Sequence, residues 1–272
     1  MKQITATVVY NKRILPGGPH RTGRALASKL IQLHCPKIEE AKPGQFVMLH
    51  CGDECVLPRP FSLHQANGDD ITIFYAVLER GKGTQWLADR KKGDTVEIVA
   101  PLGKNGFSIK PRAKNLLLVA GGMGLAPLCF LAQQAVREKH PVTLLLGVTT
   151  GPLYSERPGN LLPPGIKIFT ASEDPKDKDS VDEIGRITEF LPDFANKADQ
   201  IFACGPMGMY KAMAQIPELK EKPVQISLEV RMGCGRSVCY GCTIKTRSGL
   251  KQVCQDGPVF DLDDIPRDEL DY

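Results

Sequence analysis

Four cysteines near the carboxyl end of the chain have the spacing of an iron-sulfur ligand set. Cys234, Cys239 and Cys242 follow a four-then-two spacing, and Cys254 comes after eleven further residues. The first three match plant-type [2Fe-2S] ligation, in which thiolates hold both irons. Glycines beside these cysteines would let the backbone wrap closely around a cluster. The pattern predicts one [2Fe-2S] cluster, with segments 243–246 and 250–253 forming a hairpin that returns the fourth thiol.

Two other interpretations of these thiols stay open. A structural zinc site usually presents its four cysteines as two short-spaced pairs, whereas Cys254 stands alone. Ordinary free thiols would leave the segment after residue 226 with no evident source of stability, because it is too short for an ordinary apolar core. Elsewhere, His50, Cys51 and Cys55 resemble a metal-ligand set but have no fourth partner. We interpret them as buried core residues or as a coincidence of spacing.

Two short motifs in the first half of the chain could bind a phosphate. In Arg59-Pro60-Phe61-Ser62 the guanidinium can fork onto a phosphate, and the serine hydroxyl can hydrogen-bond the edge of a heteroaromatic ring. In Gly81-Lys82-Gly83-Thr84 the glycines let the backbone approach a pyrophosphate just before a short helix predicted at 84–90. The alternative is a proline turn followed by a capped helix. We favour a phosphate site, since the two motifs lie about twenty residues apart.

Two later motifs are typical of pyridine-nucleotide binding. Gly121-Gly122-Met123-Gly124 follows the apolar run 116–120 and opens a helical stretch at 125–138, which is where a glycine turn cradles a dinucleotide phosphate. The motif departs from G-x-G-x-x-G, so a tight strand–helix connection is the alternative. Cys204-Gly205-Pro206 follows another predicted strand, and ligands bind at strand ends of parallel sheets. The Cys204 thiol there either faces a nicotinamide or is simply buried.

Composition and charge limit the function classes that these motifs can serve. Hydrophobic residues make up 42% of the 272 residues, which suits a globular protein. The net charge of +4 is small and scattered, so we exclude a nucleic-acid partner. The strongest apolar runs, 116–120 and 144–148, are far shorter than the roughly 20 residues that span a bilayer. With no export signal visible, we expect a cytoplasmic protein with no membrane partner, whose nine cysteines are thiols or metal ligands.

The elements that position these motifs divide the chain into three parts. Residues 1–108 hold short β-runs separated by turn residues, which predicts an antiparallel barrel. Residues 109–226 alternate apolar strands with helices, which predicts an α/β domain with a parallel sheet. Within it, the charged surface loop 173–182 receives no function. Residues 227–272 form a small cluster module with an acidic tail, which either steers a basic partner surface or is a solvated terminus.

The motifs RPFS, GKGT, GGMGLAP and CGPM, in that order, resemble the ferredoxin-reductase superfamily, whose fold is an antiparallel flavin barrel followed by a pyridine-nucleotide domain. The tail, MGCGRSVCYGCTIKT with VCQDGPVFDLDDI, resembles the electron-transfer subunits of class 1B dihydroorotate dehydrogenases. This resemblance covers essentially the whole chain. It implies FAD, one [2Fe-2S] cluster and NAD, and a heterotetramer with an FMN-containing catalytic subunit that oxidises dihydroorotate in pyrimidine biosynthesis.

The same resemblance implies roles for individual residues. FAD would be bound by Arg59, Pro60, Phe61 and Ser62, lined by Ala76, Val77 and Leu78, and held at its pyrophosphate by Gly83 and Thr84. Gly122 and Gly124 would face NADH phosphates. The catalytic residues would be Ser62 beside the flavin and Cys204 beside the nicotinamide, and the iron ligands Cys234, Cys239, Cys242 and Cys254. The chain departs from the family at 15–24 and after Val148; no basic residue directly follows the second strand, which favours NAD over NADP.

Three function classes follow. The first is the dihydroorotate dehydrogenase subunit. The second is another flavin and iron-sulfur reductase of the same build, such as a sulfide dehydrogenase or an NADH-dependent ferredoxin:NADP reductase subunit. Four cysteines favour the first class over reductases in which one ligand is a carboxylate. The third is a zinc-stabilised adaptor that keeps a nucleotide-binding fold without being an enzyme.

Overall fold

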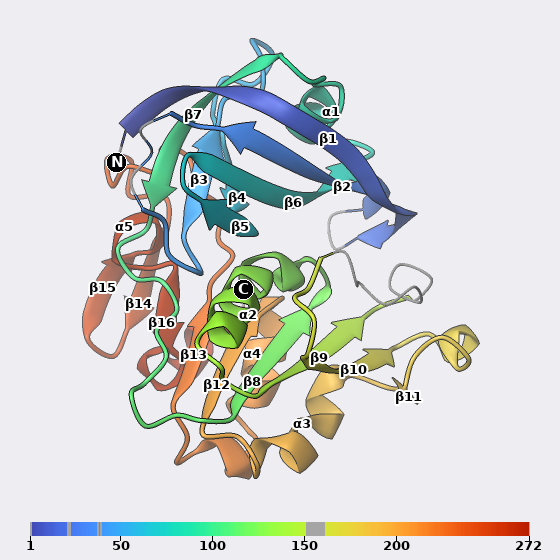
Figure 1. The fold of residues 1–272 in the computed structure, drawn as a ribbon. Helices are drawn as coiled ribbons and strands as arrows, with labels where there is room; N and C mark the ends of the chain where they lie inside the picture. The colour runs from blue at the N-terminus through green and yellow to red at the C-terminus, as the bar shows by residue number, and fades with distance from the viewer. Residues whose placement is uncertain (1, 21–22, 37, 39, 151–160, 272) are drawn as a thin grey trace.

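The chain folds around two seven-stranded sheets and a small two-stranded sheet near the carboxyl end (Figure 1). The computed structural model describes residues 2–20, 23–36, 38, 40–150 and 161–271. In Figure 1 the first sheet lies above the second, and the small sheet lies beside their junction. This arrangement confirms the predicted architecture of an antiparallel barrel sheet followed by a parallel-sheet domain.

The first sheet is antiparallel and curves into a half-barrel. Its strands run in the order β4-β3-β7-β1-β2-β6-β5. In β6, Ile71, Ile73 and Tyr75 pack inside the barrel, whereas Phe74 on the other face packs against the second sheet's helical layer. Both faces of this strand are therefore buried, and helix α1 (Lys82–Ala88) follows it. The strands are β1 (Lys2–His20), β2 (Gly23–His34), β3 (Phe46–Leu49), β4 (Arg59–Ser62), β5 (Gln65–Asn67), β6 (Asp70–Leu78) and β7 (Thr95–Leu102).

The hairpin of β1 and β2 is much longer than the short strand expected near the amino terminus. Pairing continues through Pro16 with Ala27 to His20 with Gly23, across two register shifts. Gly17 permits this close approach, since a Cβ there would lie 2.6 Å from the Leu26 carbonyl oxygen. Residues 15–20 and 23–24, the described part of the stretch expected to depart from the family, thus pair as a β-ribbon that reaches toward the second sheet.

The second sheet is parallel except at one edge. Its order is β11-β10-β9-β8-β12-β13-β16, and only β16 runs antiparallel, beside β13. Helix α2 (Leu125–Arg137) covers one face, and α3 (Ile187–Ala195) and α4 (Met207–Met213) cover the other (Figure 1). The strands are β8 (Leu116–Gly121), β9 (Val142–Val148), β10 (Lys167–Ser172), β11 (Glu183–Ile184), β12 (Gln200–Cys204), β13 (Val224–Ser227) and β16 (Val259–Asp261); short 3-10 turns are η1 (Gly122–Gly124), η2 (Pro175–Asp177) and η3 (Pro217–Leu219).

The carboxyl-terminal segment shares a core with both large sheets. The predicted hairpin is confirmed as β14 (Thr243–Thr246) and β15 (Gly249–Gln252), followed by α5 (Val253–Asp256). Apolar burial does stabilise this segment, contrary to the sequence expectation, because its side chains pack against the two large sheets. Ile244 and Val253 belong to the same apolar cluster as Met48 and Ile226. Short strands alone do not reveal such a shared core.

The acidic tail is docked rather than freely solvated. Its two 3-10 turns, η4 (Leu262–Asp264) and η5 (Arg267–Asp271), bury Leu262 and Ile265 beneath exposed carboxylates. Asp264 accepts hydrogen bonds from the Ser248 backbone N–H at 3.1 Å and hydroxyl at 3.0 Å. Of the two alternatives for the acidic tail, a freely solvated terminus is therefore excluded.

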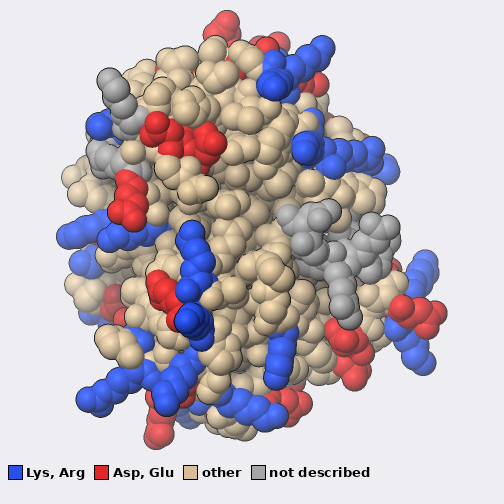
Figure 2. Space-filling model, viewed as in Figure 1, with Lys and Arg blue, Asp and Glu red and all other residues tan. Residues whose placement is uncertain are grey.

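Surface charge is mixed rather than segregated. On the face shown in Figure 2, Lys and Arg side chains alternate with Asp and Glu over both sheets. Within the described part of the chain, no helix combines the length and apolar character that crossing a membrane requires.

Candidate functional site

A cavity of about 450 Å³ lies between the carboxyl ends of the parallel strands and the barrel sheet. The second sheet contributes the turns after β8, β9, β10 and β12, and the barrel contributes β1, β2 and β6. Three residues predicted for cofactor binding, Ala76, Gly122 and Gly124, are brought together in its wall. Ligand sites of α/β sheets occupy this position.

The glycine turn after β8 packs directly against the turn after β12. A Cβ on Gly124 would overlap the Cys204 carbonyl group and lie 2.9 Å from the Gly205 backbone nitrogen, and a Cβ on Gly121 would lie 2.7 Å from Pro206. Gly122 has φ +53° and open space around it. Glycine is therefore required at 124 for close packing and favoured at 122 for conformation, which leaves the backbone bare toward the cavity.

Cys204 lies beneath this turn rather than in the cavity wall. Its side chain is 1% exposed, and its thiol donates to the Ser227 carbonyl oxygen at 3.8 Å. Burial raises the pKa of the Cys204 thiol, with the nearby Glu229 carboxylate adding to the effect. Pro206 and Met209, a few residues further on, line the cavity instead. The thiol is thus neutral and packed against backbone.

Tyr210 fixes the turn that follows Cys204. Its hydroxyl accepts from the Gly205 backbone N–H at 2.9 Å and donates to the Ser227 carbonyl oxygen at 2.6 Å. Because β13 ends at Ser227 and leads into the cysteine segment, this buried side chain links the nucleotide-side turn to the start of the cluster loop.

The two predicted phosphate motifs of the barrel meet in space. The segment Arg59–Ser62 forms the edge strand β4, and a Cβ on Gly83 would lie 3.2 Å from Arg59 Cγ and from Cys51 Cβ. Phe61 packs edge-on against Tyr75, with ring centroids 5.8 Å apart. This adjacency of an arginine and a bare glycine backbone fits a pyrophosphate.

Thr84 ties the start of α1 to the end of β6. Its hydroxyl accepts from the Leu78 backbone N–H at 2.9 Å and donates to the Gly81 carbonyl oxygen at 3.0 Å. Along β6, Ala76 lines the cavity while Val77 points into the barrel core. These contacts set the spacing between the strand and the glycine turn.

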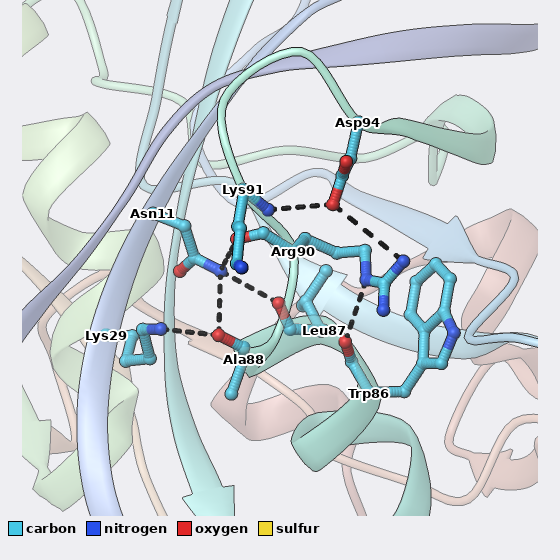
Figure 3. A network of polar contacts seen from close by, with 8 residues as sticks. All are labelled: Asn11, Lys29, Trp86, Leu87, Ala88, Arg90, Lys91 and Asp94. Carbon is cyan, nitrogen blue, oxygen red and sulfur yellow. Dashed lines mark hydrogen bonds and ion pairs between the residues drawn. The ribbon is translucent and has the colours of Figure 1, made fainter.

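The carboxyl end of α1 is anchored to the barrel by a polar network (Figure 3). Asn11 Nδ2 donates to the carbonyl oxygens of Leu87 at 2.8 Å and Arg90 at 3.0 Å. Lys29 Nζ donates to the Ala88 carbonyl oxygen at 2.6 Å. The network satisfies carbonyls that a helix end leaves unpaired and so fixes the helix that carries Gly83.

The four predicted iron ligands are gathered as two pairs of thiols. Cys234 and Cys239 share one side-chain hydrogen bond, and Cys242 and Cys254 share another. Among the described residues, no three His, Cys, Asp or Glu side chains converge on a point that could hold a single metal ion. A [2Fe-2S] centre differs from a single-metal site, because its two irons are held by four thiolates, two on each iron. The two pairs of thiols fit this arrangement.

Backbone amides of the loop point at these sulfurs. Cys234 Sγ accepts from the N–H groups of Arg236 at 3.3 Å, Val238 at 3.4 Å and Cys239 at 3.4 Å. Partial burial acts to raise the pKa of Cys234, but these hydrogen bonds lower it to about 6. Burial raises the pKa of Cys254 to about 12, and its hydrogen bond with Cys242 adds to that shift. Amides directed at thiolate sulfur are what an iron-sulfur loop uses to set its potential.

The loop exposes one edge of the cysteine set. Cys239 is exposed between Val238, which is 74% exposed, and Tyr240, which is 69% exposed, whereas Cys242 and Cys254 are buried. Ser237 and Tyr240 take positive φ values of +63° and +56°. Ser237 is partly buried and its hydroxyl donates a hydrogen bond to Gln252, whereas Val238 and Tyr240 leave an apolar surface beside the cysteines.

Several cavity residues were not anticipated from the sequence. Ser28 and His20 come from the long hairpin, whose length no short-range pattern indicated. Glu173 and Arg186 come from the charged loop region and the start of α3. The signal available for Glu173 was its place directly after a predicted strand of a parallel sheet.

Comparisons with known proteins agree with this geometry. Residues 229–266 match the family model described as the iron-sulfur cluster binding domain of dihydroorotate dehydrogenase B, and residues 118–215 match the oxidoreductase NAD-binding domain. The dihydroorotate dehydrogenase B (NAD(+)) electron transfer subunit of Caldanaerobacter subterraneus subsp. tengcongensis is 34% identical over 249 residues, covering 90% of this chain and 95% of that protein. The subunit of the same name from Clostridium acetobutylicum is 35% identical over 81% of this chain and 85% of that one.

Solved structures share the fold. A chain of an NADH-dependent reduced ferredoxin-NADP oxidoreductase superposes with a TM-score of 0.78 at 24% identity, covering 97% of this chain and 91% of that chain. The ferredoxin reductase of carbazole 1,9a-dioxygenase superposes with a TM-score of 0.69 at 20% identity, over 83% of this chain and 68% of that one. With relatives matched over almost their full length, the chain belongs to the family of dihydroorotate dehydrogenase B (NAD(+)) electron transfer subunits.

Proposed function

We propose that this chain transfers electrons between NADH and the FMN-containing catalytic subunit of a dihydroorotate dehydrogenase, through FAD and one [2Fe-2S] cluster. The observation that carries the proposal is the arrangement of four thiols in two pairs, reached through the same segment that follows the nucleotide-side strands. The family membership supports the reaction: oxidation of dihydroorotate to orotate in pyrimidine biosynthesis.

Each cofactor has residues suited to hold it. For FAD these are the edge strand Arg59–Ser62, the β6 residues Ala76, Val77 and Leu78, and the Gly83-Thr84 turn; for NADH they are Gly122 and Gly124; for the cluster they are Cys234, Cys239, Cys242 and Cys254. Together the cofactors supply hydride transfer, conversion of an electron pair into single electrons, and one-electron transfer outward. We propose domain boundaries of 1–108, 109–226 and 227–272 for the three binding regions.

The chain's own residues position and shield these groups. The bare backbone at Gly122 would donate hydrogen bonds from its N–H to phosphate oxygens, and the small side chains of Ala76 and Ser28 leave room where barrel and parallel sheet face each other. Ser62, on the edge strand, would donate a hydrogen bond to the flavin ring. Cys204 would act only indirectly, from beneath the turn, where its neutral thiol packs against backbone and supports the turn after β12.

The catalytic subunit docks, in this proposal, on the apolar surface formed by Val238, Tyr240 and Leu250. These side chains are 74%, 69% and 75% exposed, and Val238 and Tyr240 flank the exposed Cys239 along the chain. A cluster held in part by Cys239 would have its exposed edge at this surface. Exposed apolar residues grouped in this way mark interaction surfaces. Two copies of each subunit form a heterotetramer, and the nine free cysteines suit the reducing cytoplasm.

Reconstitution of the complex tests the function. The purified chain is expected to contain flavin and about two irons, and to support NADH formation from dihydroorotate and NAD only when mixed with the catalytic subunit. A chain that reduces dyes with NADH but neither binds nor supports the catalytic subunit would contradict the proposal. A colourless chain loaded with zinc would contradict it as well.

A matched pair of surface variants tests the docking site. Val238→Asp is expected to weaken association with the catalytic subunit at least tenfold while flavin and iron contents stay unchanged, because a carboxylate would be buried in the interface. Val56→Asp is the control, since Val56 is 90% exposed on the barrel, outside the cysteine loop. Equal affinities for the two variants would exclude the cysteine-loop surface.

A further inference from the structure

A charged pair lies in the cavity wall, two strands away from the glycine turn. Glu173 follows β10, and Arg186 is the N-cap residue of α3. Arg186 Nε donates to Glu173 Oε2 at 3.3 Å, and both residues line the cavity. The cavity therefore runs from Pro206 after β12, past the Gly122 turn after β8, to this pair beside β10.

The backbone beneath the pair is fixed on both sides. Glu173 N donates to the Val148 carbonyl oxygen at 3.1 Å, and Gly185 N donates to the Ser172 carbonyl oxygen at 2.8 Å. Gly185 has φ +145°, a backbone conformation that favours glycine directly before Arg186. The carboxylate and the guanidinium thus project from two anchored positions.

Folding stability does not explain this pair. The Arg186 side chain is 72% exposed and that of Glu173 is 45% exposed, and ion pairs exposed to this degree contribute little to stability. The contact uses Nε of Arg186, so the terminal nitrogens, which form a fork suited to phosphate, are not part of it. The backbone positions of the two residues are anchored, yet their ion pair contributes little to stability. Binding of a ligand in the cavity is therefore the better explanation for the pair.

The charges of the cavity wall indicate which ligand. Among the described residues that line it, Arg186 is the only lysine or arginine, while Glu173 and Glu229 are carboxylates. With Arg186 paired, the described residues at the β10 end of the cavity present a hydrogen-bond acceptor and no further lysine or arginine. That chemistry suits a ribose diol, whose hydroxyls donate, and disfavours an added phosphate, which needs a free cation.

We propose that Glu173 determines the nucleotide specificity of this cavity: its carboxylate accepts hydrogen bonds from the adenosine ribose of NADH and holds Arg186 away from the 2′-phosphate of NADPH. This inference rests on the proposed function, since it assumes that the nucleotide phosphates lie at the Gly122 turn. The nicotinamide end then faces Pro206 and the barrel, and the adenosine end reaches Glu173. The loop that the sequence left without a function supplies the selectivity.

Direct binding to the full chain tests this inference without relying on turnover. Calorimetry with 5′-AMP and 2′,5′-ADP compares ligands that differ by the 2′-phosphate. The wild-type chain is expected to bind 5′-AMP more tightly. In Glu173→Gln the affinity ratio should shift toward 2′,5′-ADP by at least tenfold, and in the double variant Glu173→Gln with Arg186→Gln this gain should disappear. The ratio of kcat/KM for NADH and NADPH in dye reduction should move in parallel.

Controls separate the possible failures. Glu183→Gln removes the same charge from exposed β11 outside the cavity and should leave the ratio unchanged. If wild type oxidises NADH selectively but Glu173→Gln and Glu173→Ala both keep the wild-type ratio, or if the gain persists without Arg186, the inference is overturned and the proposed function stands. If wild type uses neither nucleotide, the proposed function fails too. Thermal unfolding within a few degrees of wild type confirms that each variant is folded.

Discussion

Replacing Gly124 by alanine tests whether close packing of the two turns builds the nucleotide site. The added Cβ would overlap the Cys204 carbonyl group and sit 2.9 Å from Gly205 N, and both neighbours are backbone atoms that cannot rotate away. Ordinary contact distances of about 3.5 Å require a shift of roughly 0.6 Å to clear Gly205 N alone, and relieving the overlap with the Cys204 carbonyl requires the turns to separate by more than about 1 Å. Overpacking of this kind costs about 1–3 kcal/mol, and contact with backbone places Gly124→Ala at the upper end.

Both stability and NADH use should respond. A loss of about 3 kcal/mol corresponds to a fall in Tm of about 6–12 °C for a chain of this size. Displacement of the phosphate-binding turn by about 1 Å or more should reduce kcat/KM for NADH by about hundredfold. The assay is NADH-dependent dye reduction by the flavin-loaded chain, paired with differential scanning calorimetry.

A second glycine separates this effect from general strain. Gly68, in the turn between β5 and β6, has φ +57° and open space, so Gly68→Ala should cost about 1–2 kcal/mol and leave the KM for NADH unchanged. If Gly124→Ala retained wild-type kcat/KM for NADH, the turn after β8 would not hold the nucleotide phosphates. The packing explanation of the site would then be refuted.

Three further predictions concern residues that support the site. His64 is buried, its Nε2 donates to the Leu161 carbonyl oxygen at 3.1 Å, and burial lowers its pKa to about 4. Because the folded-state pKa lies below the unfolded value of about 6.5, its neutral form contributes full stability above pH 6.5. Up to about 3 kcal/mol is lost as pH falls from 6.5 to 4, a slope that His64→Gln should flatten in urea titrations. Asn11→Ala removes the amide that binds the Leu87 carbonyl and should cost about 2–3 kcal/mol and speed FAD release measured by flavin fluorescence. Tyr210→Phe leaves the Gly205 N–H buried without its partner and should cost about 1–3 kcal/mol, with a raised KM for NADH.

Each of these has an outcome that contradicts it. An unchanged pH slope in His64→Gln would show that another group titrates between barrel and parallel sheet. Retention of FAD at the wild-type rate in Asn11→Ala would separate the helix anchor from flavin binding. A Tyr210→Phe variant that loses stability while keeping its KM would leave Tyr210 with a folding role alone.

The sequence predicted the strands and helices that carry a strong local pattern. Four of the parallel strands, β8, β9, β10 and β12, and the cysteine hairpin with its turn residues were placed within a residue or two, whereas β11 and β13 were not predicted. The β1–β2 ribbon was missed because its prolines and glycines indicate turns, while its pairing depends on bulges and on contacts far along the chain.

In the site, too, features with a local sequence signal were predicted, and features that depend on the fold were not. Glycine turns and cysteine spacing are local signals, and the structure brings Gly122, Gly124 and Ala76 to one cavity and the four thiols into pairs. Cys204 has the right place along the chain, but the packing of Gly124 over it buries the thiol, which spacing cannot show. The pair of Glu173 and Arg186 depends on the fold bringing two loops together.

Electron paramagnetic resonance of the cofactor-loaded chain, frozen after anaerobic addition of NADH, tests the central claim most directly. We expect one [2Fe-2S] signal per chain, formed together with loss of flavin absorbance and abolished in Cys242→Ser. Complete reduction of the flavin by NADH with no cluster signal in the unmodified chain would contradict the proposed path of electrons.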